Sequence, residues 1–267
     1  MVHKSISTGR GAVHYWMDGD GDRAMLFTHG ATMDHGLFRF QMDHFAQRFR
    51  VITWDVPAHG QSRPYEHFSL QNAAQELIAI LDAESISSAH LVGQSMGGYI
   101  SQIAAAEHPA RVLTISAVDS SPVQVSYYSG LDRWLLSITP FLLSLYPYST
   151  LVNTIANQIA ISPAARSYAL ETLKTFTKTE IAHIMGAVYD GLLQYNHARL
   201  RCPVLIVCGA RDRTGKVRTY CDRWAAKEGR ELRIIPNAAH NANMDNPEEF
   251  DRILEKFLEK AELKAQV

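Results

Sequence analysis

The chain has 267 residues, of which 46% are hydrophobic and 20% are charged, and its formal net charge is −1. These values predict one large globular α/β domain, or such a domain with an insertion. A net charge this close to zero gives no electrostatic reason to expect nucleic acid or an anionic membrane surface as a partner.

We find no targeting or metal-binding signal in the sequence. No apolar run lies near Met1, so we expect no signal peptide. The longest apolar stretch, residues 134–146, is broken by Ser137, Thr139 and Pro140, and we expect no stable membrane insertion. Three cysteines without a C-x-x-C pair favour a reducing cytoplasm over a disulfide framework. We therefore expect a cytoplasmic protein with no metal and no cofactor.

Along the first 120 residues or so, short apolar runs alternate with segments of helical apolar spacing. The runs that predict strands are residues 4–8, 12–17, 24–28, 50–55, 89–92 and 112–117. The segments that predict helices are residues 34–49, 70–83 and 96–107. Strands and helices that alternate in this way form a mostly parallel sheet with helices on both faces.

The alternation stops at Asp119, and residues 122–196 contain no convincing strand. Ser162-Pro163 is a typical helix start within this segment. Helical spacing recurs in at least three blocks, residues 131–146, 163–175 and 179–195. We interpret residues 122–196 as an inserted all-helical cap over a discontinuous core domain, residues 1–121 and 197–267.

Core elements resume after the cap. The predicted strands are residues 203–208 and 232–235, and the predicted helices are residues 217–227 and 247–263. They add two further strands to the same sheet.

The pattern Gly93-x-Ser95-x-Gly97 lies between a predicted strand and a predicted helix. A strand that turns at once into a helix strains its corner residue, and the flanking positions have room only for glycine. The corner hydroxyl is left exposed at a helix N-terminus, as in a nucleophile elbow. We therefore predict that Ser95 is a nucleophile.

A serine nucleophile needs a base, and the base needs an acid to orient it. Asp212 follows the strand 203–208, and His240 follows the strand 232–235. The ends of these strands lie at the same sheet edge as Ser95, so we predict Asp212 as the acid and His240 as the base.

Other residues compete for these two roles. Asp119 also follows a strand that ends at this edge, and it is the rival acid. His29 and His59 are rival bases, but each precedes a glycine of a turn and is expected to brace its loop.

An oxyanion hole needs two backbone N–H groups that point at one site. We predict that the N–H of Met96, directly after the nucleophile, is one of them. The other is assigned to Ala31, because Gly30 lets the backbone approach closely. Gly30 is therefore also placed at the substrate pocket.

The cap segment is unusually apolar between residues 127 and 145. Three interpretations stay open: packing of cap helices on each other, a membrane-surface or partner contact, and a roof over an apolar pocket above Ser95. In the third, Trp134 and Phe141 line the pocket.

The motifs as a set resemble those of the α/β-hydrolase fold superfamily, in its serine-nucleophile members with a helical cap. The matching pieces are His29-Gly30, Asp55-x-Pro57-x-His59-Gly60-x-Ser62, Gly93-Gln94-Ser95-Met96-Gly97-Gly98, Gly209-x-x-Asp212 and His240. The resemblance implies a triad of Ser95, Asp212 and His240. Ala58 departs from it, because the family loop often has glycine there.

Three functions remain open under this resemblance. The first is hydrolysis of a carboxylic ester or lactone of a small-molecule substrate with a small to medium apolar acyl group. The second is carbon–carbon hydrolysis or cofactor-free perhydrolysis with the same triad. The third is a ligand receptor or interaction protein with slow turnover. The sequence leaves a homodimer open.

Overall fold

The computed structural model describes residues 1–195 and 199–265, and in these residues eight strands form a single sheet. The strand order is β1-β2-β4-β3-β5-β6-β7-β8. The bounds are Val2–Thr8 (β1), Gly11–Asp18 (β2), Ala24–Thr28 (β3), Arg50–Trp54 (β4), Ala89–Gln94 (β5), Val112–Val118 (β6), Val204–Gly209 (β7) and Glu231–Ile235 (β8). β2 pairs antiparallel with β1 and β4, and every other pairing is parallel. The predicted fold class, a mostly parallel sheet flanked by helices, is confirmed.

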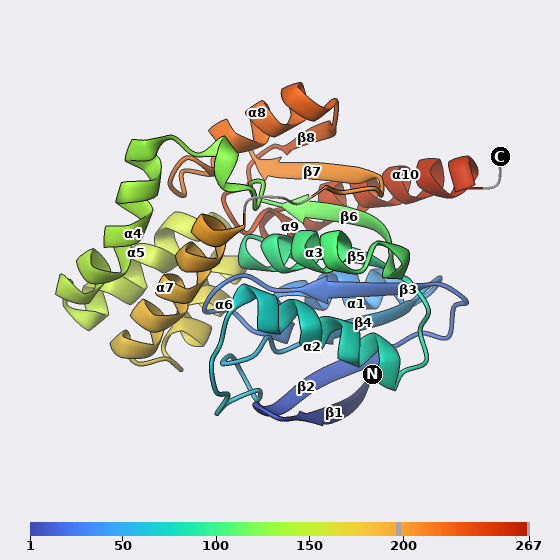
Figure 1. The fold of residues 1–267 in the computed structure, drawn as a ribbon, viewed down its shortest axis with the longest axis horizontal. Coiled ribbons are helices and arrows are strands. Elements are labelled where there is room, and N and C mark those ends of the chain that lie inside the picture. The colour runs from blue at the N-terminus through green and yellow to red at the C-terminus, as the bar shows by residue number, and fades with distance from the viewer. Residues whose placement is uncertain (196–198, 266–267) are drawn as a thin grey trace.

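Helices cover both faces of this sheet. α2 and α3 cross the near face in Figure 1, whereas α1 and α10 lie behind the sheet. The helices outside the cap are Arg39–Phe45 (α1), Leu70–Ala83 (α2), Met96–Glu107 (α3), Val217–Glu228 (α8), Ala242–Asp245 (α9) and Pro247–Ala265 (α10). Every residue of β3, β5 and β7 is buried. This burial on both faces explains why β3 and β7 are nearly continuous apolar runs rather than alternating ones.

One predicted helix is shorter than expected. Residues 34–49 form a 3-10 turn, His35–Phe38, followed by α1, which ends at Phe45. Gly19 packs so closely against the carbonyl oxygen of Phe49 that a Cβ on it would lie 2.2 Å away. The chain after α1 therefore turns to meet this loop instead of continuing as helix.

The parallel strands bring their carboxyl ends to one edge of the sheet. Thr28 at the end of β3 pairs with Gly93 in β5, and Val118 at the end of β6 pairs with Val207 in β7. The loops that follow β3, β5, β6 and β7 therefore meet at this edge.

The segment between β6 and β7 is helical in its described part, and we call its helices α4 to α7 the cap. Their bounds are Gly130–Leu145 (α4), Tyr148–Ile159 (α5), Pro163–Leu173 (α6) and Lys178–Gln194 (α7). The cap lies at the end of the sheet where β3 and β5 finish, on the left in Figure 1. α5 is an additional helix between two of the predicted blocks. The predicted domain boundary at residues 196–197 lies outside the described residues.

Within the described part of the chain, none of the helices has the length and apolar character that crossing a bilayer requires. The most apolar candidate from the sequence, residues 134–146, falls mainly in α4, and that helix contains Pro140.

Candidate active site

Ser95 occupies a strained corner between β5 and α3. Its φ and ψ angles are 51° and −115°, a conformation that costs energy for a residue with a side chain. A Cβ on Gly93 would lie 2.2 Å from the carbonyl oxygen of Gly97, and one on Gly97 would lie 2.0 Å from that of Thr28. Only glycine fits at these two positions, as the predicted elbow requires.

Neighbouring strands hold this corner in place. The N–H of Ser95 donates to the carbonyl oxygen of Val118 at 2.8 Å, which ties the corner to the end of β6. Ser120 Oγ donates to the carbonyl oxygen of Ser95 at 2.7 Å. The strain at Ser95 is therefore maintained by backbone contacts that leave its side chain free to line a cavity.

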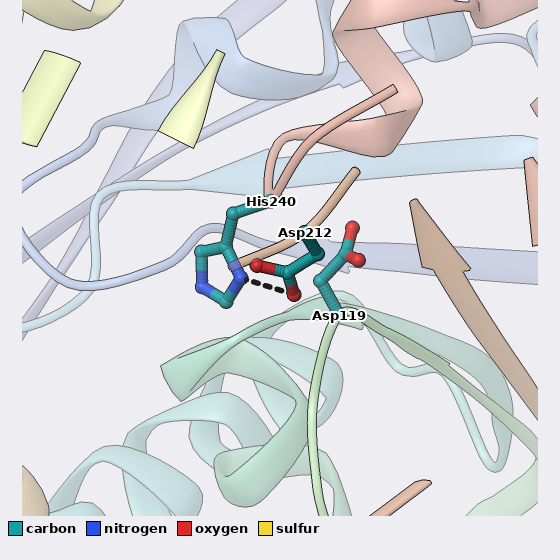
Figure 2. A group of neighbouring side chains, drawn as sticks. All are labelled: Asp119, Asp212 and His240. Carbon is teal, nitrogen blue, oxygen red and sulfur yellow. Dashed lines mark hydrogen bonds and ion pairs between the residues drawn. The ribbon is translucent and has the colours of Figure 1, made fainter. Parts of the chain in front are cut away.

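His240 and Asp212 form the hydrogen-bonded pair expected of a base and its orienting acid. His240 Nδ1 lies 2.9 Å from Asp212 Oδ2, as the dashed line in Figure 2 shows. The turn after β7 positions Asp212, whose Oδ1 accepts the N–H of Thr214 at 2.8 Å. Burial acts to raise the pKa of Asp212, but the facing His240 outweighs it and holds this pKa below its usual value.

Asp119, the rival acid, lies beside this pair without bonding to His240 (Figure 2). Its Oδ1 accepts the N–H of Gly209 at 2.7 Å, and its Oδ2 accepts the N–H of Ala242 at 3.2 Å. Burial, and then the negative charge of Asp212, raise the pKa of Asp119 well above its usual value. Asp119 therefore links the end of β7, before the turn that carries Asp212, to the loop that carries His240.

The rival bases bond to backbone groups of their own and neighbouring loops. His29 Nε2 accepts the N–H of Val56 at 2.9 Å, and its Nδ1 lies 2.7 Å from the carbonyl oxygen of Gly30. His59 Nδ1 lies 2.9 Å from the carbonyl oxygen of Pro57. Burial lowers the pKa of His29 to about 4 and that of His59 to about 3. Both rings therefore brace loops as neutral groups.

Two positioning residues were missed at the level of sequence. Gln94 Nε2 donates to the carbonyl oxygen of His240 at 2.7 Å. Asp245 Oδ2 accepts the N–H of Ala239 at 2.8 Å, and its Oδ1 accepts the N–H of Ser162 from the cap, also at 2.8 Å. Gln94 occupies a position of the elbow motif where the residue type varies. In the sequence, only its place directly before Ser95 could have indicated a role.

The predicted oxyanion donors belong to the helix that follows Ser95 and to the loop that follows β3. Met96 is the first residue of α3, and the N–H groups in the first turn of a helix have no partner inside that helix. Ala31 lines the same cavity as Ser95. A Cβ on Gly30 would lie 2.0 Å from Gln94 Oε1, so a side chain at this position would displace Gln94. Gly30 therefore lies directly against the elbow, and the roles of Ala31 and Met96 as oxyanion donors stay predictions.

A cavity of about 570 Å³ connects Ser95 and His240 with the underside of the cap. Apolar side chains from α4, α5 and α7 make up much of its wall. They are Leu135, Leu136, Leu143, Ile155, Ile159, Ile181 and Met185. The polar lining comes from both the cap and the core, at Asp132 and Gln158 in the cap and at Lys216, Tyr220 and Asn241 in the core.

The structure does not bring Trp134 and Phe141 to this cavity. Their side chains are 57% and 65% exposed, and neither lines the wall. Both lie on the outer face of α4, whereas Leu136 and Leu143 of the same helix face inward. α4 is apolar around most of its circumference, so helical spacing alone pointed to the wrong face. Gly30 is a neighbour of Ser95 but not part of the cavity wall.

Asp119, Asp212 and His240 are close enough to be considered as metal ligands. One atom from each lies within 4.8 Å of the others. However, both oxygens of Asp119 accept backbone N–H groups, and His240 is bonded to Asp212. The donor set is already used for hydrogen bonding, so we assign no metal to it.

A family model described as alpha/beta hydrolase fold matches residues 23–247 of the chain. Curated relatives extend over most of the chain at low identity. The chain is 25% identical over 241 residues to 3-oxoadipate enol-lactonase 1 of Acinetobacter baylyi, covering 88% of each protein. It is 27% identical over 248 residues to pimeloyl-[acyl-carrier protein] methyl ester esterase of Chromobacterium violaceum, covering 88% of this chain and 94% of the esterase.

A third relative is longer than this chain. It is the dihydrolipoyllysine-residue acetyltransferase component of the acetoin cleaving system of Cupriavidus necator, 27% identical over 252 residues. The match covers 92% of this chain but only 66% of that protein.

Proposed function

Because the chain belongs to the alpha/beta hydrolase fold family, we propose that it is a serine hydrolase of carboxylic esters or lactones with a small to medium apolar acyl group. One observation carries the proposal. Ser95 at a strained elbow and His240, bonded to Asp212 at 2.9 Å, line a single apolar cavity. This combination supplies a nucleophile, a base with its acid, and a place for an acyl chain.

In the first half of the reaction, Ser95 Oγ attacks the carbonyl carbon of the ester, and His240 Nε2 accepts the hydroxyl proton. The hydrogen bond from His240 Nδ1 to Asp212 fixes the tautomer that leaves Nε2 free and stabilises the imidazolium. The N–H groups of Ala31 and Met96 donate to the oxyanion of the tetrahedral intermediate. This intermediate collapses to the acyl-enzyme, and the leaving alcohol takes the proton from His240.

In the second half, a water molecule attacks the acyl carbon, and its proton passes to His240. The new tetrahedral intermediate releases the carboxylic acid, and Ser95 Oγ recovers its proton from His240. The reaction consumes one water per ester and needs no further reactant, so the chain itself supplies every catalytic group.

The choice of an ester or lactone rests on the nucleophile, the cavity and the relatives. Serine at the elbow suits acyl transfer. The apolar cap wall suits an alkyl or aryl acyl group, since each buried methylene contributes about 0.8 kcal/mol. One relative is named an enol-lactonase and another a methyl ester esterase, and both of these names describe cleavage of an ester bond.

The proposal is tested with a panel of p-nitrophenyl esters, from acetyl to dodecanoyl, and with γ-lactones of matched chain length. We expect hydrolysis with an interior optimum of chain length, and a fluorophosphonate adduct that maps to Ser95 by mass spectrometry. Ser95→Ala should hydrolyse neither the esters nor the lactones. Labelling of another residue, or turnover that survives Ser95→Ala, would overturn the proposal.

A further inference from the structure

An apolar surface along α4 and at its C-terminal end is left uncovered by the rest of the described chain. Six large apolar side chains there are 43–65% exposed. They are Leu131, Trp134, Phe141, Leu142, Leu145 and Tyr146. Side chains of this size have roughly 150–250 Å² of surface each, so on the order of 600 Å² is open to solvent. A patch of about this size is at the upper end of what a monomer exposes, and it indicates an interaction site.

Part of this surface has the spacing of two helices that pack side by side. Five residues follow one another at intervals of three, four, three and four positions, and we call them the outer seam. They are Leu131, Trp134, Ile138, Phe141 and Leu145. This repeat places the five side chains in one stripe along the helix, the arrangement that packs against a second helix. A lipid surface requires only a broad apolar face and no such stripe.

The opposite side of α4 is already used within one copy of the chain. Asp132, Leu136 and Leu143 line the cavity. α7 packs along the helix, and a Cβ on Gly186 of α7 would lie 3.8 Å from Pro140 Cγ. The outer seam is therefore a second apolar face of α4, and the fold of a single copy does not use it.

The charges near the outer seam favour a second copy of the chain as the occupant. Among residues 130–146 only Asp132 and Arg133 are charged, and neither belongs to the seam. Asp132 faces the cavity, and Lys178 of α7 donates to carbonyl oxygens of the last turn of α4. Two uncharged seams can meet without bringing like charges together, whereas a charged partner would find no complementary ion. An anionic lipid surface would find no row of cations.

From this surface we propose that α4 forms the interface of a homodimer, in which the outer seams of two copies pack against each other across a two-fold axis. Two copies of the surface bury about 1,200 Å² before any polar rim is counted, and a specific interface needs roughly 1,000 Å² or more. Trp134 and Phe141 contribute most, since large aromatic side chains dominate such interfaces. One face of each α4 then roofs its own cavity while the other holds the partner. This inference is independent of the proposed reaction.

The mass of the full chain in solution tests the inference. Sedimentation equilibrium at up to about 100 μM, above the micromolar range of the weakest interfaces of this kind, should give twice the chain mass of 29.9 kDa. Trp134→Glu and Phe141→Glu should each give the monomer, because a charge would be buried without a partner. Leu263→Glu is the matched control and should stay dimeric. Leu263 is 67% exposed in α10, whose C-terminal end lies on the opposite side of the molecule from α4 (Figure 1).

Trp134 also gives a signal specific to the interface, because the other three tryptophans are at most 6% exposed. Acrylamide should quench the fluorescence of the wild type less as the protein concentration rises. In Phe141→Glu the quenching should not depend on concentration.

Ile138 lies in the middle of the outer seam, so its copy lies close to it whether the two helices run parallel or antiparallel. A short bismaleimide should therefore link two copies of Ile138→Cys. The wild type is the control for its own three cysteines, of which Cys208 and Cys221 are buried, and it should not be linked. This variant keeps the test decisive if a glutamate variant fails to fold, which circular dichroism and thermal unfolding show.

A wild type that stays monomeric at about 100 μM would contradict the homodimer, and so would a dimer that persists in both folded glutamate variants. Absence of cross-linking in Ile138→Cys would place any dimer interface elsewhere. Vesicles of phosphatidylcholine and phosphatidylglycerol test the remaining occupant. Binding of a monomeric wild type to these vesicles, lost in Trp134→Glu, would assign the surface to lipid and reject the homodimer.

Discussion

Gln94 donates a hydrogen bond from Nε2 to the backbone carbonyl oxygen of His240 at 2.7 Å. Gln94 directly precedes Ser95, so the residue beside the proposed nucleophile holds the backbone of the proposed base, His240. Both partners are buried, and water competes little for this bond. This bond ties the His240 loop to the end of β5, directly before Ser95.

Gln94→Leu should lower kcat by roughly tenfold to a hundredfold with little change in KM, because small displacements of catalytic groups cost this much. Steady-state kinetics on the preferred ester give both constants. Gln41→Leu is the control, since Gln41 is equally buried but bonds to Asn243 and Asp251 instead. Equal loss of kcat in the two variants would mean that Gln94 acts only through stability.

Asp212→Asn should reduce turnover by roughly 10⁴, the effect of the corresponding change in a serine protease, because the amide favours the wrong histidine tautomer. Asp119→Asn should instead keep turnover within about tenfold and lower the free energy of unfolding by roughly 1–3 kcal/mol, because one backbone N–H loses its acceptor. Kinetics and urea unfolding of both variants make the comparison. The reverse pattern would assign the acid role to Asp119.

Leu136→Ala should move the acyl-chain optimum toward longer esters, because Leu136 lines the cavity and its truncation opens space. Below the optimum, two added carbons should raise kcat/KM by roughly tenfold. Trp134→Ala should leave the profile unchanged, since Trp134 is 57% exposed on the outer face of α4. The measurement is kcat/KM from acetyl to dodecanoyl esters, and a shift with Trp134→Ala alone would contradict the assigned faces.

Ala58→Gly should raise the free energy of unfolding by about 0.5–1 kcal/mol. Ala58 has a φ of 66°, a left-handed conformation that glycine adopts at lower cost. Gly60→Ala should lower the free energy of unfolding by about 2 kcal/mol or more, since a Cβ there would lie 2.1 Å from Asp55 Oδ2. Urea unfolding of both variants tests this pair, and a stable Gly60→Ala would show that the loop can rearrange.

His90→Leu should gain free energy of unfolding relative to the wild type as the pH falls. Burial lowers the pKa of His90 to about 4 in the folded state, against about 6.5 in an unfolded chain. Between these values only the unfolded chain takes up the proton, so this histidine removes stability as the pH drops. The advantage of the variant should grow by about 2 kcal/mol from pH 7.5 to pH 5.

Urea unfolding at these two pH values measures this difference. Thr114→Val is the control, because it removes the hydroxyl 2.9 Å from His90 Nδ1 but keeps the titrating ring. Its effect should depend much less on pH. A constant difference between wild type and His90→Leu would show that His90 is not held neutral.

The sequence predicted those parts of the site that depend on local geometry. The glycines around Ser95 are required by contacts within a few residues or with the next strand, so their pattern is visible in the chain. Asp212 and His240 could be placed because each follows a strand whose end must lie at one edge of a parallel sheet. The predicted roles of these two residues rest on the topology of the sheet more than on the residues next to them in the sequence.

The parts that could not be predicted depend on contacts between distant segments. Gln94 and His240 are 146 positions apart, and nothing in their local sequence indicates that they meet. In α4, apolar residues lie on all sides, so periodicity could not separate the outward Trp134 from the inward Leu136.

The cap is hydrogen-bonded to the loops that carry Asp212 and His240. Ile159 accepts the N–H of Asn241, Gln158 donates to the carbonyl oxygen of Arg213, and Asp245 accepts the N–H of Ser162. These bonds limit how such a protein can exchange modules with its relatives. A chimera that replaced only residues 122–195 would have to bring a backbone carbonyl, a backbone N–H and a side-chain donor to the same three places. One that also carried residues 210–216 and 237–246 would keep the transplanted cap and its bonding partners together.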